Sequence, residues 1–166
     1  MKDETKERLI ACAREEFLEK GYQGASLRSI CKKAGVTTGA LYFFFQDKED
    51  LFAAIVQPTL NQVRAMAEQH VKQELMALQK LPGADKDNMH DDRNATEQIL
   101  HVLYQNYDIC QLLLTKSQGS RYENCIDEFV DIFENGQKAL AEEQAKQLGV
   151  QPPDDYILHW VIHIEM

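Results

Sequence analysis

The sequence predicts an all-α protein, and three observations support this fold class. Glycine and proline, the residues that helix interiors tolerate least, number only 8 and 4 among 166 residues. Hydrophobic residues make up 44% of the chain, which is enough for a buried core. Apolar residues also recur three and four positions apart through most of the chain, as in amphipathic helices. The length suits one domain of average size or two small ones.

The first expected helix covers residues 3–20. Its apolar side chains fall at helical spacing on one face, and they are Leu9, Ile10, Ala13 and Phe17. Gly21 and Gly24 are expected to end it.

Two short helices joined by a tight turn are expected next, between Ser26 and Phe45. The Ser26 hydroxyl would cap the first helix by accepting from N–H groups of its first turn. Gly35 suits the left-handed residue that ends this helix, and Thr37 would cap the second. Leu41 and Phe45, four residues apart, are expected to face inward. Two helices joined by a glycine-containing turn form a helix-turn-helix, whose second helix enters the DNA major groove.

A long helix is expected from Asp47, which would cap it, to about Lys80. In the first turns of this helix, the apolar face consists of Leu51, Phe52 and Ile55. Pro58 removes a backbone hydrogen bond and should kink or divide this helix. A hinge and a harmless bend are both open interpretations of Pro58.

Positive charge is concentrated around the helix-turn-helix. The window from Lys20 to Lys48 holds five basic residues and one acid, a net charge of +4 on a chain of −9. Its basic residues are Lys20, Arg28, Lys32, Lys33 and Lys48. A basic patch on an acidic protein is typical of a phosphate-binding surface. Residues 1–50 are neutral overall and residues 51–166 carry −9, so the second part is not expected to lie along DNA.

The stretch from Thr5 to Ile55 contains a set of residues at fixed spacing: Ile30, Ala34-Gly35-Val36, Thr37, Gly39, Leu41-Tyr42, Phe45 and Lys48-Glu49-x-Leu51. At these positions the stretch resembles the DNA-binding domain of the tetracycline-repressor (TetR) family of bacterial transcriptional regulators. Three positions depart from the family pattern. Cys31 replaces a small residue, and Phe43 and Phe44 replace a histidine or another polar aromatic.

The resemblance implies a role for each exposed residue of the motif. Base edges would be contacted from the groove side of the second helix by Thr38, Gly39, Ala40 and Phe43. These are not the usual bidentate base readers, so specificity would depend on thymine methyl groups, one hydroxyl, close backbone approach and DNA shape. Phosphates would be bound by Ser26, Arg28, Thr37, Tyr42 and Lys48.

The second half of the chain is expected to contain further helices. Residues 84–93 are polar and lack periodicity, which predicts a loop. Asn94-x-x-Glu97 and Ser120-x-x-Glu123 are capping-box patterns that would open two helices, with a short apolar helix at 108–116 between them. Gly149 and Pro152-Pro153 would end the last of these. A final apolar helix would follow, capped by Asp154-Asp155.

The resemblance divides the chain into a helix-turn-helix DNA-binding domain (1–50) and a helical domain for effector binding and dimerisation (51–166). It implies a homodimer on a palindromic operator of double-stranded DNA. The dimer interface would comprise Cys125, Ile126, Phe129, Ile132, Phe133, Gly136 and Leu140. It also implies a pocket for a small hydrophobic or aromatic effector, lined by His101, Tyr104, Tyr107, Gln111, Tyr122, Phe129 and Trp160. Family members usually continue for a few more turns beyond the position of Met166, so the C-terminus is expected to be incomplete.

Catalytic motifs are lacking in the sequence. It has no phosphate-binding glycine loop, no G-x-S-x-G and no H-E-x-x-H. His159 and His163 are spaced i, i+4, but we interpret them as core or pocket residues because no third ligand is evident. We therefore expect no enzyme, no cofactor and no metal site.

The expected location is the cytoplasm, without membrane contact, because the N-terminus lacks an apolar signal core and no apolar run is long enough to span a bilayer. We expect a transcriptional regulator, a repressor that the effector releases from DNA. Two alternatives stay open: a DNA-binding regulator without a small-molecule effector, and a helical adaptor or enzyme that reuses the scaffold.

Overall fold

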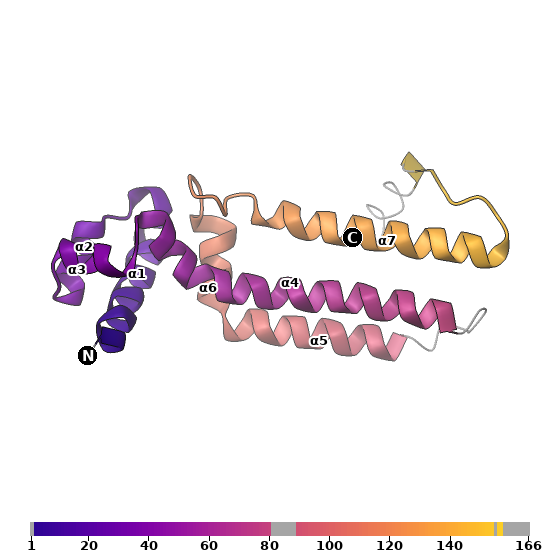
Figure 1. The fold of residues 1–166 in the computed structure, drawn as a ribbon, viewed down its shortest axis with the longest axis horizontal. Coiled ribbons are helices and arrows are strands. Elements are labelled where there is room, and N and C mark those ends of the chain that lie inside the picture. The colour runs from indigo at the N-terminus through magenta and orange to yellow at the C-terminus, as the bar shows by residue number, and fades with distance from the viewer. Residues whose placement is uncertain (1, 81–88, 155, 158–166) are drawn as a thin grey trace. The chain divides into compact units, whose positions relative to one another are not determined.

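The structure is a computed structural model that describes residues 2–80, 89–154 and 156–157. All regular structure within these ranges is helical (Figure 1), which confirms the predicted fold class. The named elements are α1 (Lys2–Gly24), α2 (Leu27–Ala34), α3 (Thr38–Phe44), α4 (Lys48–Lys80), α5 (Met89–Gln105), α6 (Tyr107–Gln111), the π-helix η1 (Leu112–Lys116) and α7 (Cys125–Leu148). None of the described helices combines the length and apolar character that a membrane span requires.

The chain forms two compact units that are each discontinuous in sequence. The first unit combines Met1–Asn61 with Val102–Cys125, and the second combines Gln62–His101 with Ile126–Met166. Helices α4 and α5 therefore each contribute to both units. The division into functional domains at residue 50 stays a prediction.

The core of the first unit gathers side chains from α1 to α4 and from the 102–125 segment. Phe17 and Phe52 are fully buried and meet edge to face, with ring centroids 4.9 Å apart. Tyr122 brings its ring to 6.0 Å from that of Phe52. Leu112 of η1 is also fully buried. Burying such side chains contributes about 1.5–3 kcal/mol each, so the 102–125 segment is part of this core rather than an addition to it.

Two glycines set the chain direction around α2. Gly21 has φ 71° and ψ 170° and interrupts α1, near the predicted end of the first helix. Gly35 has φ 65°, and the backbone N–H groups of Gly35 and Val36 donate to the carbonyls of Lys32 and Cys31 at the end of α2. The predicted left-handed cap at Gly35 is confirmed.

Helix α4 runs through Pro58 without a break, so the proline does not divide the helix. Its predicted start is confirmed, because the Asp47 carboxylate accepts from the Asp50 N–H at 2.8 Å. Whether Pro58 acts as a hinge stays a prediction.

Both predicted capping boxes are wrong. Helix α5 begins at Met89, so Asn94 lies inside it and residues 89–93 are helical rather than a loop. This segment contains no glycine or proline, and its polar composition alone does not prevent a helix. Residues 81–88 lie outside the described ranges.

The second box closes a turn ahead of α7, which begins at Cys125. The Ser120 hydroxyl accepts from the Tyr122 N–H at 3.1 Å, and the Glu123 carboxylate accepts from the Gly119 N–H at 2.8 Å. Gly119 has φ 81°, which bends the chain away from a helical path at this point. The predicted end of α7 is confirmed, since Gly149 follows Leu148 with φ 66°.

In the second unit, α7 packs along α4. Arg64 pairs with Glu128, Gly136 faces Val71, and the Gln147 side chain donates to the Leu78 carbonyl at 2.7 Å. Residue numbers increase together along both helices, so α4 and α7 are parallel (Figure 1).

Candidate nucleic-acid interface

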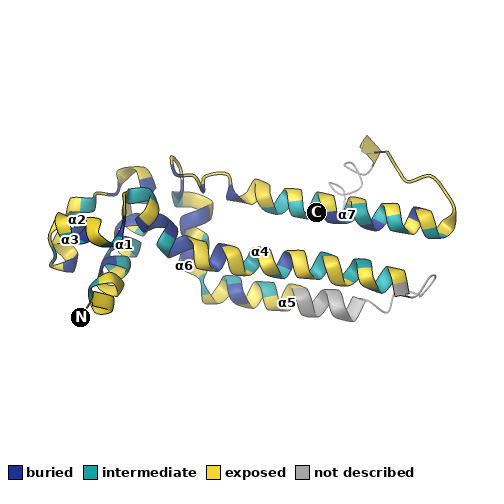
Figure 2. Ribbon diagram, in the orientation of Figure 1, coloured by how far each residue is buried: buried dark blue, intermediate teal, exposed yellow. Residues whose placement is uncertain are grey.

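The α2–turn–α3 segment forms a helix-turn-helix with one buried and one exposed face. Leu41 and Phe45 are 0% and 3% exposed and hold α3 against the core, as predicted. On the other side, Tyr42 and Phe43 are 57% and 67% exposed. Figure 2 shows that α3 has both buried and exposed residues. Rings of this size usually bury themselves, so their exposure indicates a contact surface on α3.

The two predicted hydroxyl caps differ. The Thr37 Oγ1 accepts from the Ala40 N–H at 3.2 Å and caps α3. Ser26 occupies the N-cap position of α2 with an extended backbone, but its side chain makes no capping hydrogen bond. The prediction of a Ser26 side-chain cap is therefore wrong. Its hydroxyl is on the exposed surface instead.

Most of the predicted DNA-contacting residues are exposed in the first unit. Beyond the residues already described, Arg28, Thr38 and Gly39 are exposed and Ala40 is half-buried. Lys48 has partners of its own. Its Nζ donates to the carbonyls of Gln23 and Ala25, at 3.3 and 3.5 Å, and lies 4.6 Å from the centroid of the Tyr22 ring.

A buried carboxylate removes two cations from the predicted basic patch. Glu16 has no exposed surface. It accepts from Lys20 at 2.7 Å and from Ser29 at 3.0 Å, and it pairs with Lys33 at 3.0 Å. Burial alone raises the pKa of the Glu16 carboxyl, but the hydrogen bonds from Lys20, Lys33 and Ser29 outweigh it and lower the pKa to about 2. Lys33 therefore joins α2 to α1, whereas Lys20 pairs with Glu16 within α1, and neither offers an unpaired charge.

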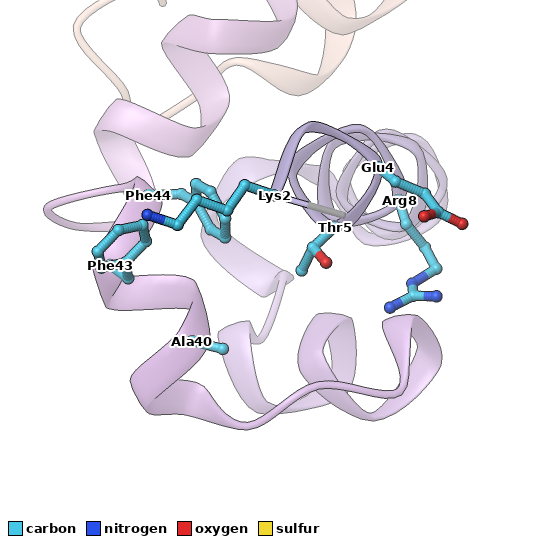
Figure 3. Close-up of a pocket in the computed structure, with 7 residues that line it drawn as sticks. All are labelled: Lys2, Glu4, Thr5, Arg8, Ala40, Phe43 and Phe44. Carbon is cyan, nitrogen blue, oxygen red and sulfur yellow. The ribbon is translucent and has the colours of Figure 1, made fainter.

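Other cations lie beside α3 on the first turns of α1, outside the basic patch from Lys20 to Lys48. The Lys2 Nζ lies 5.1 Å from the centroid of the Phe43 ring, and the Lys6 Nζ lies 5.8 Å from that of Phe45. An open cleft separates the two helices (Figure 3). Its lining residues are Lys2, Glu4, Thr5 and Arg8 from α1 and Ala40, Phe43 and Phe44 from α3.

A signal for these residues exists in the sequence. At 3.6 residues per turn, Lys2, Thr5, Lys6 and Arg8 fall on one side of α1, and Asp3, Glu4 and Glu7 fall on the other. The charges of the two groups cancel in the net charge of residues 1–50, so that sum does not reveal the basic side of α1.

The candidate effector residues are dispersed. Tyr104 and Tyr107 are 77% and 66% exposed, and His101 and Gln111 are exposed. Tyr122 is buried in the aromatic core of the first unit, and Phe129 of the second unit is half-buried. Trp160, like His159 and His163, lies outside the described residues. An effector pocket made by these residues stays a prediction.

The candidate dimer residues occupy two sides of α7. Cys125, Gly136 and Leu140 are buried within the chain, and Phe129 and Ile132 are half-buried. Ile126 and Phe133, seven residues apart, are 51% and 50% exposed. This exposed pair is the part of the predicted interface that is accessible to a second chain.

The helix-turn-helix region is similar in sequence to that of known proteins. Residues 9–55 match the family model described as bacterial regulatory proteins, tetR family. The chain is similar to the HTH-type transcriptional repressor BepR of Brucella suis, with 45% identity over 53 residues, covering 32% of this chain and 25% of BepR. It is similar to the HTH-type transcriptional regulator UidR of Escherichia coli, with 41% identity over 63 residues, covering 38% of this chain and 31% of UidR. These matches therefore span a quarter to a third of the relatives' length.

Similar solved structures extend over more of the chain. One is NalD, the secondary repressor of the MexAB-OprM multidrug efflux pump in Pseudomonas aeruginosa, with a TM-score of 0.59 and 25% identity over 96% of this chain and 80% of NalD. Another is a transcriptional regulator from Aquifex aeolicus, with a TM-score of 0.57 and 24% identity over 98% of this chain and 99% of that one. The second likeness concerns the fold alone.

Proposed function

We propose that this chain, whose residues 9–55 match the model of the tetR family of bacterial regulatory proteins, is a DNA-binding transcriptional regulator that acts as a repressor. The observation that carries the proposal is the exposed face of α3, with Thr37 capping the helix and Leu41 anchoring it to the core. BepR and NalD are named repressors, which supports the direction of regulation.

In this proposal α3 enters the major groove. Thr38, Gly39, Ala40 and Phe43 contact base edges, and the Phe43 ring meets thymine methyl groups. Ser26, Arg28, Thr37, Tyr42 and Lys48 bind phosphates. The exposure of Arg28 and Ser26 at the start of α2 supports their part in this set.

Two copies of the chain bind one operator. The exposed pair Ile126 and Phe133 supports a dimer contact through α7, because such a seven-residue repeat forms one seam of a helix bundle. Two DNA-binding heads would then contact major grooves about 34–36 Å apart, which requires a near-palindromic operator.

A small hydrophobic or aromatic effector releases the protein from DNA by favouring a conformation that no longer fits the operator. Contacts within the first unit support coupling between the 102–125 segment and the DNA-binding helices. Arg14 of α1 pairs with Asp108 of α6. Glu49 of α4 accepts from the Tyr22 hydroxyl at 2.7 Å and from the Arg121 N–H at 3.2 Å.

A second candidate is a DNA-binding regulator controlled by a protein partner instead of a small molecule. The exposed tyrosines Tyr104 and Tyr107 favour it, because tyrosine is enriched at protein interfaces. A thermal-shift screen separates the two candidates, since a small effector should stabilise the protein and a regulator without one should show no stabilisation.

The proposed function is tested by selecting DNA from a random pool with the full chain and measuring mobility shifts across a salt series. We expect a near-palindromic sequence, bound selectively and with affinity that falls steeply as salt increases. Weak binding that is equal on all sequences would contradict a specific regulator.

A further inference from the structure

We propose that the start of α1 forms a second phosphate-binding edge of the DNA interface, in which Lys2 and Arg8 bind the sugar-phosphate backbone from the two ends of the cleft between α1 and α3. The inference rests on the proposed DNA binding and adds residues outside the helix-turn-helix to it.

The cleft lies beside α3, and Phe43, on the face of α3 proposed to enter the groove, lines it together with Ala40. Lys2 stands at the Phe43 end of the cleft, and the Arg8 side chain approaches from the other side, with Thr5 between them (Figure 3). A helix in the major groove is bordered by both sugar-phosphate backbones. Cations on a helix that packs beside α3 are therefore placed where a backbone passes.

Lys2 and Lys6 are held in position beside α3 by aromatic rings. The Lys2 Nζ rests 5.1 Å from the Phe43 ring centroid, and the Lys6 Nζ rests 5.8 Å from that of Phe45. A cation over an aromatic face is attracted by about 0.5–1 kcal/mol at an exposed site. That attraction orients the ammonium groups without neutralising them.

Within the ranges that the structure describes, no ion pair involves Lys2, Lys6 or Arg8, whereas Lys20 and Lys33 are both paired with Glu16. Glu4 also lines the cleft, but its carboxylate is turned away from Phe43 and Phe44 (Figure 3). The guanidinium of Arg8 can donate two parallel hydrogen bonds to one phosphate, and the Lys2 ammonium adds a point charge.

The test uses the full chain and the DNA sequence that it selects from a random pool. Binding is measured by fluorescence anisotropy across a salt series for the wild type, Lys2→Ala, Arg8→Ala and Arg8→Lys. The matched control is Lys72→Ala, an exposed lysine of α4 in the second unit. Phosphate-ethylation interference is measured in parallel for the wild type and Arg8→Ala.

Lys2→Ala and Arg8→Ala should each lower the affinity and reduce the slope of log Kobs against log[salt] by about 0.9 or less. The preferred sequence should not change. Arg8→Lys should recover part of the slope, Lys72→Ala should match the wild type, and Arg8→Ala should lose interference at one defined phosphate. A merely structural role for Arg8 would not move a single ethylation site.

The inference is overturned, and the proposed function stays intact, if the wild type binds selectively with steep salt dependence, both alanine variants keep the wild-type slope, and Arg8→Ala keeps the wild-type interference pattern. Binding that is unselective but still flattened by Arg8→Ala would support the phosphate edge and overturn the proposed function. No binding at any salt concentration would overturn both.

Discussion

The ammonium of Lys33 lies 3.0 Å from a carboxylate oxygen of Glu16, and Glu16 has no exposed surface. One helical turn of α2 is thus attached to the middle of α1 by a buried charge. Lys20 and Ser29 complete the set of donors. The arrangement explains why a patch that appears strongly basic in sequence has fewer available cations in the folded protein.

We predict that Glu16 makes the stability of the protein sensitive to acid. Its pKa is lowered from 4.5 to about 2 in the folded state, so its contribution is present above pH 4.5 and is lost as the pH falls through 2. That contribution is at most about 3 kcal/mol. Urea unfolding at pH 7 and pH 3 should show Glu16→Gln destabilised mainly at pH 7. Exposed Glu15→Gln is the control, and an equal loss at both pH values would contradict the prediction.

Substitutions of Thr37 and Ser26 should distinguish an effect on stability from an effect on DNA binding. Thr37→Ala removes the cap of α3 and should cost about 1 kcal/mol of unfolding free energy. Ser26→Ala removes no capping bond and should leave stability within about 0.5 kcal/mol, while weakening DNA binding. Urea titrations and anisotropy on the same samples measure both effects. A destabilised Ser26→Ala would contradict the assignment.

Lys48→Ala should have two effects. Loss of the bonds to the Gln23 and Ala25 carbonyls should lower the unfolding free energy by about 1 kcal/mol. Loss of the proposed phosphate contact should weaken binding to all sequences alike and flatten the salt slope. A changed base preference in the selected pool would show that the role given to Lys48 is wrong.

Phe43 should discriminate thymine from uracil. Replacing one contacted thymine by deoxyuridine removes a single methyl group, which should cost about 0.8 kcal/mol in binding to the wild type. Phe43→Ala should bind both DNAs equally weakly, which a double-mutant cycle measures by anisotropy. If the variant kept the full preference for thymine, the methyl group would be recognised by another residue.

Gly136→Ala should destabilise the second unit although alanine favours helices. An added Cβ would lie 2.7 and 2.9 Å from the two γ-methyl carbons of Val71, and such overpacking costs about 1–3 kcal/mol. Val71→Ala in the same chain should restore most of the loss. Gly24→Ala, whose Cβ would meet only Lys20 Cβ at 3.5 Å, is the matched control. Thermal unfolding of these three variants and the wild type measures the effect.

Local rules predicted the helix-turn-helix well. The conformation of Gly35, the Thr37 cap and the inward positions of Leu41 and Phe45 each depend on residues within one or two turns of the chain. Such short-range determinants are visible in sequence.

The errors came from interactions that a sequence window does not contain. Glu16 neutralises Lys33 from another helix, so counting charges from residue 20 onward overestimates the patch. Glu123 accepts from an N–H in the turn at Gly119 rather than at a helix start, so the capping-box pattern predicts the wrong helix boundary. The cleft beside Phe43 depends on how α1 packs against α3, which periodicity alone does not determine.

The discontinuity of the first unit has a consequence for synthesis on the ribosome. The nascent helix-turn-helix emerges early, but Leu112 and Tyr122, which complete its core, are made much later. At typical elongation rates the delay is on the order of seconds. During that interval Phe52 lacks the neighbouring Tyr122 ring. The first unit can reach its final packing only after residue 125 has left the exit tunnel.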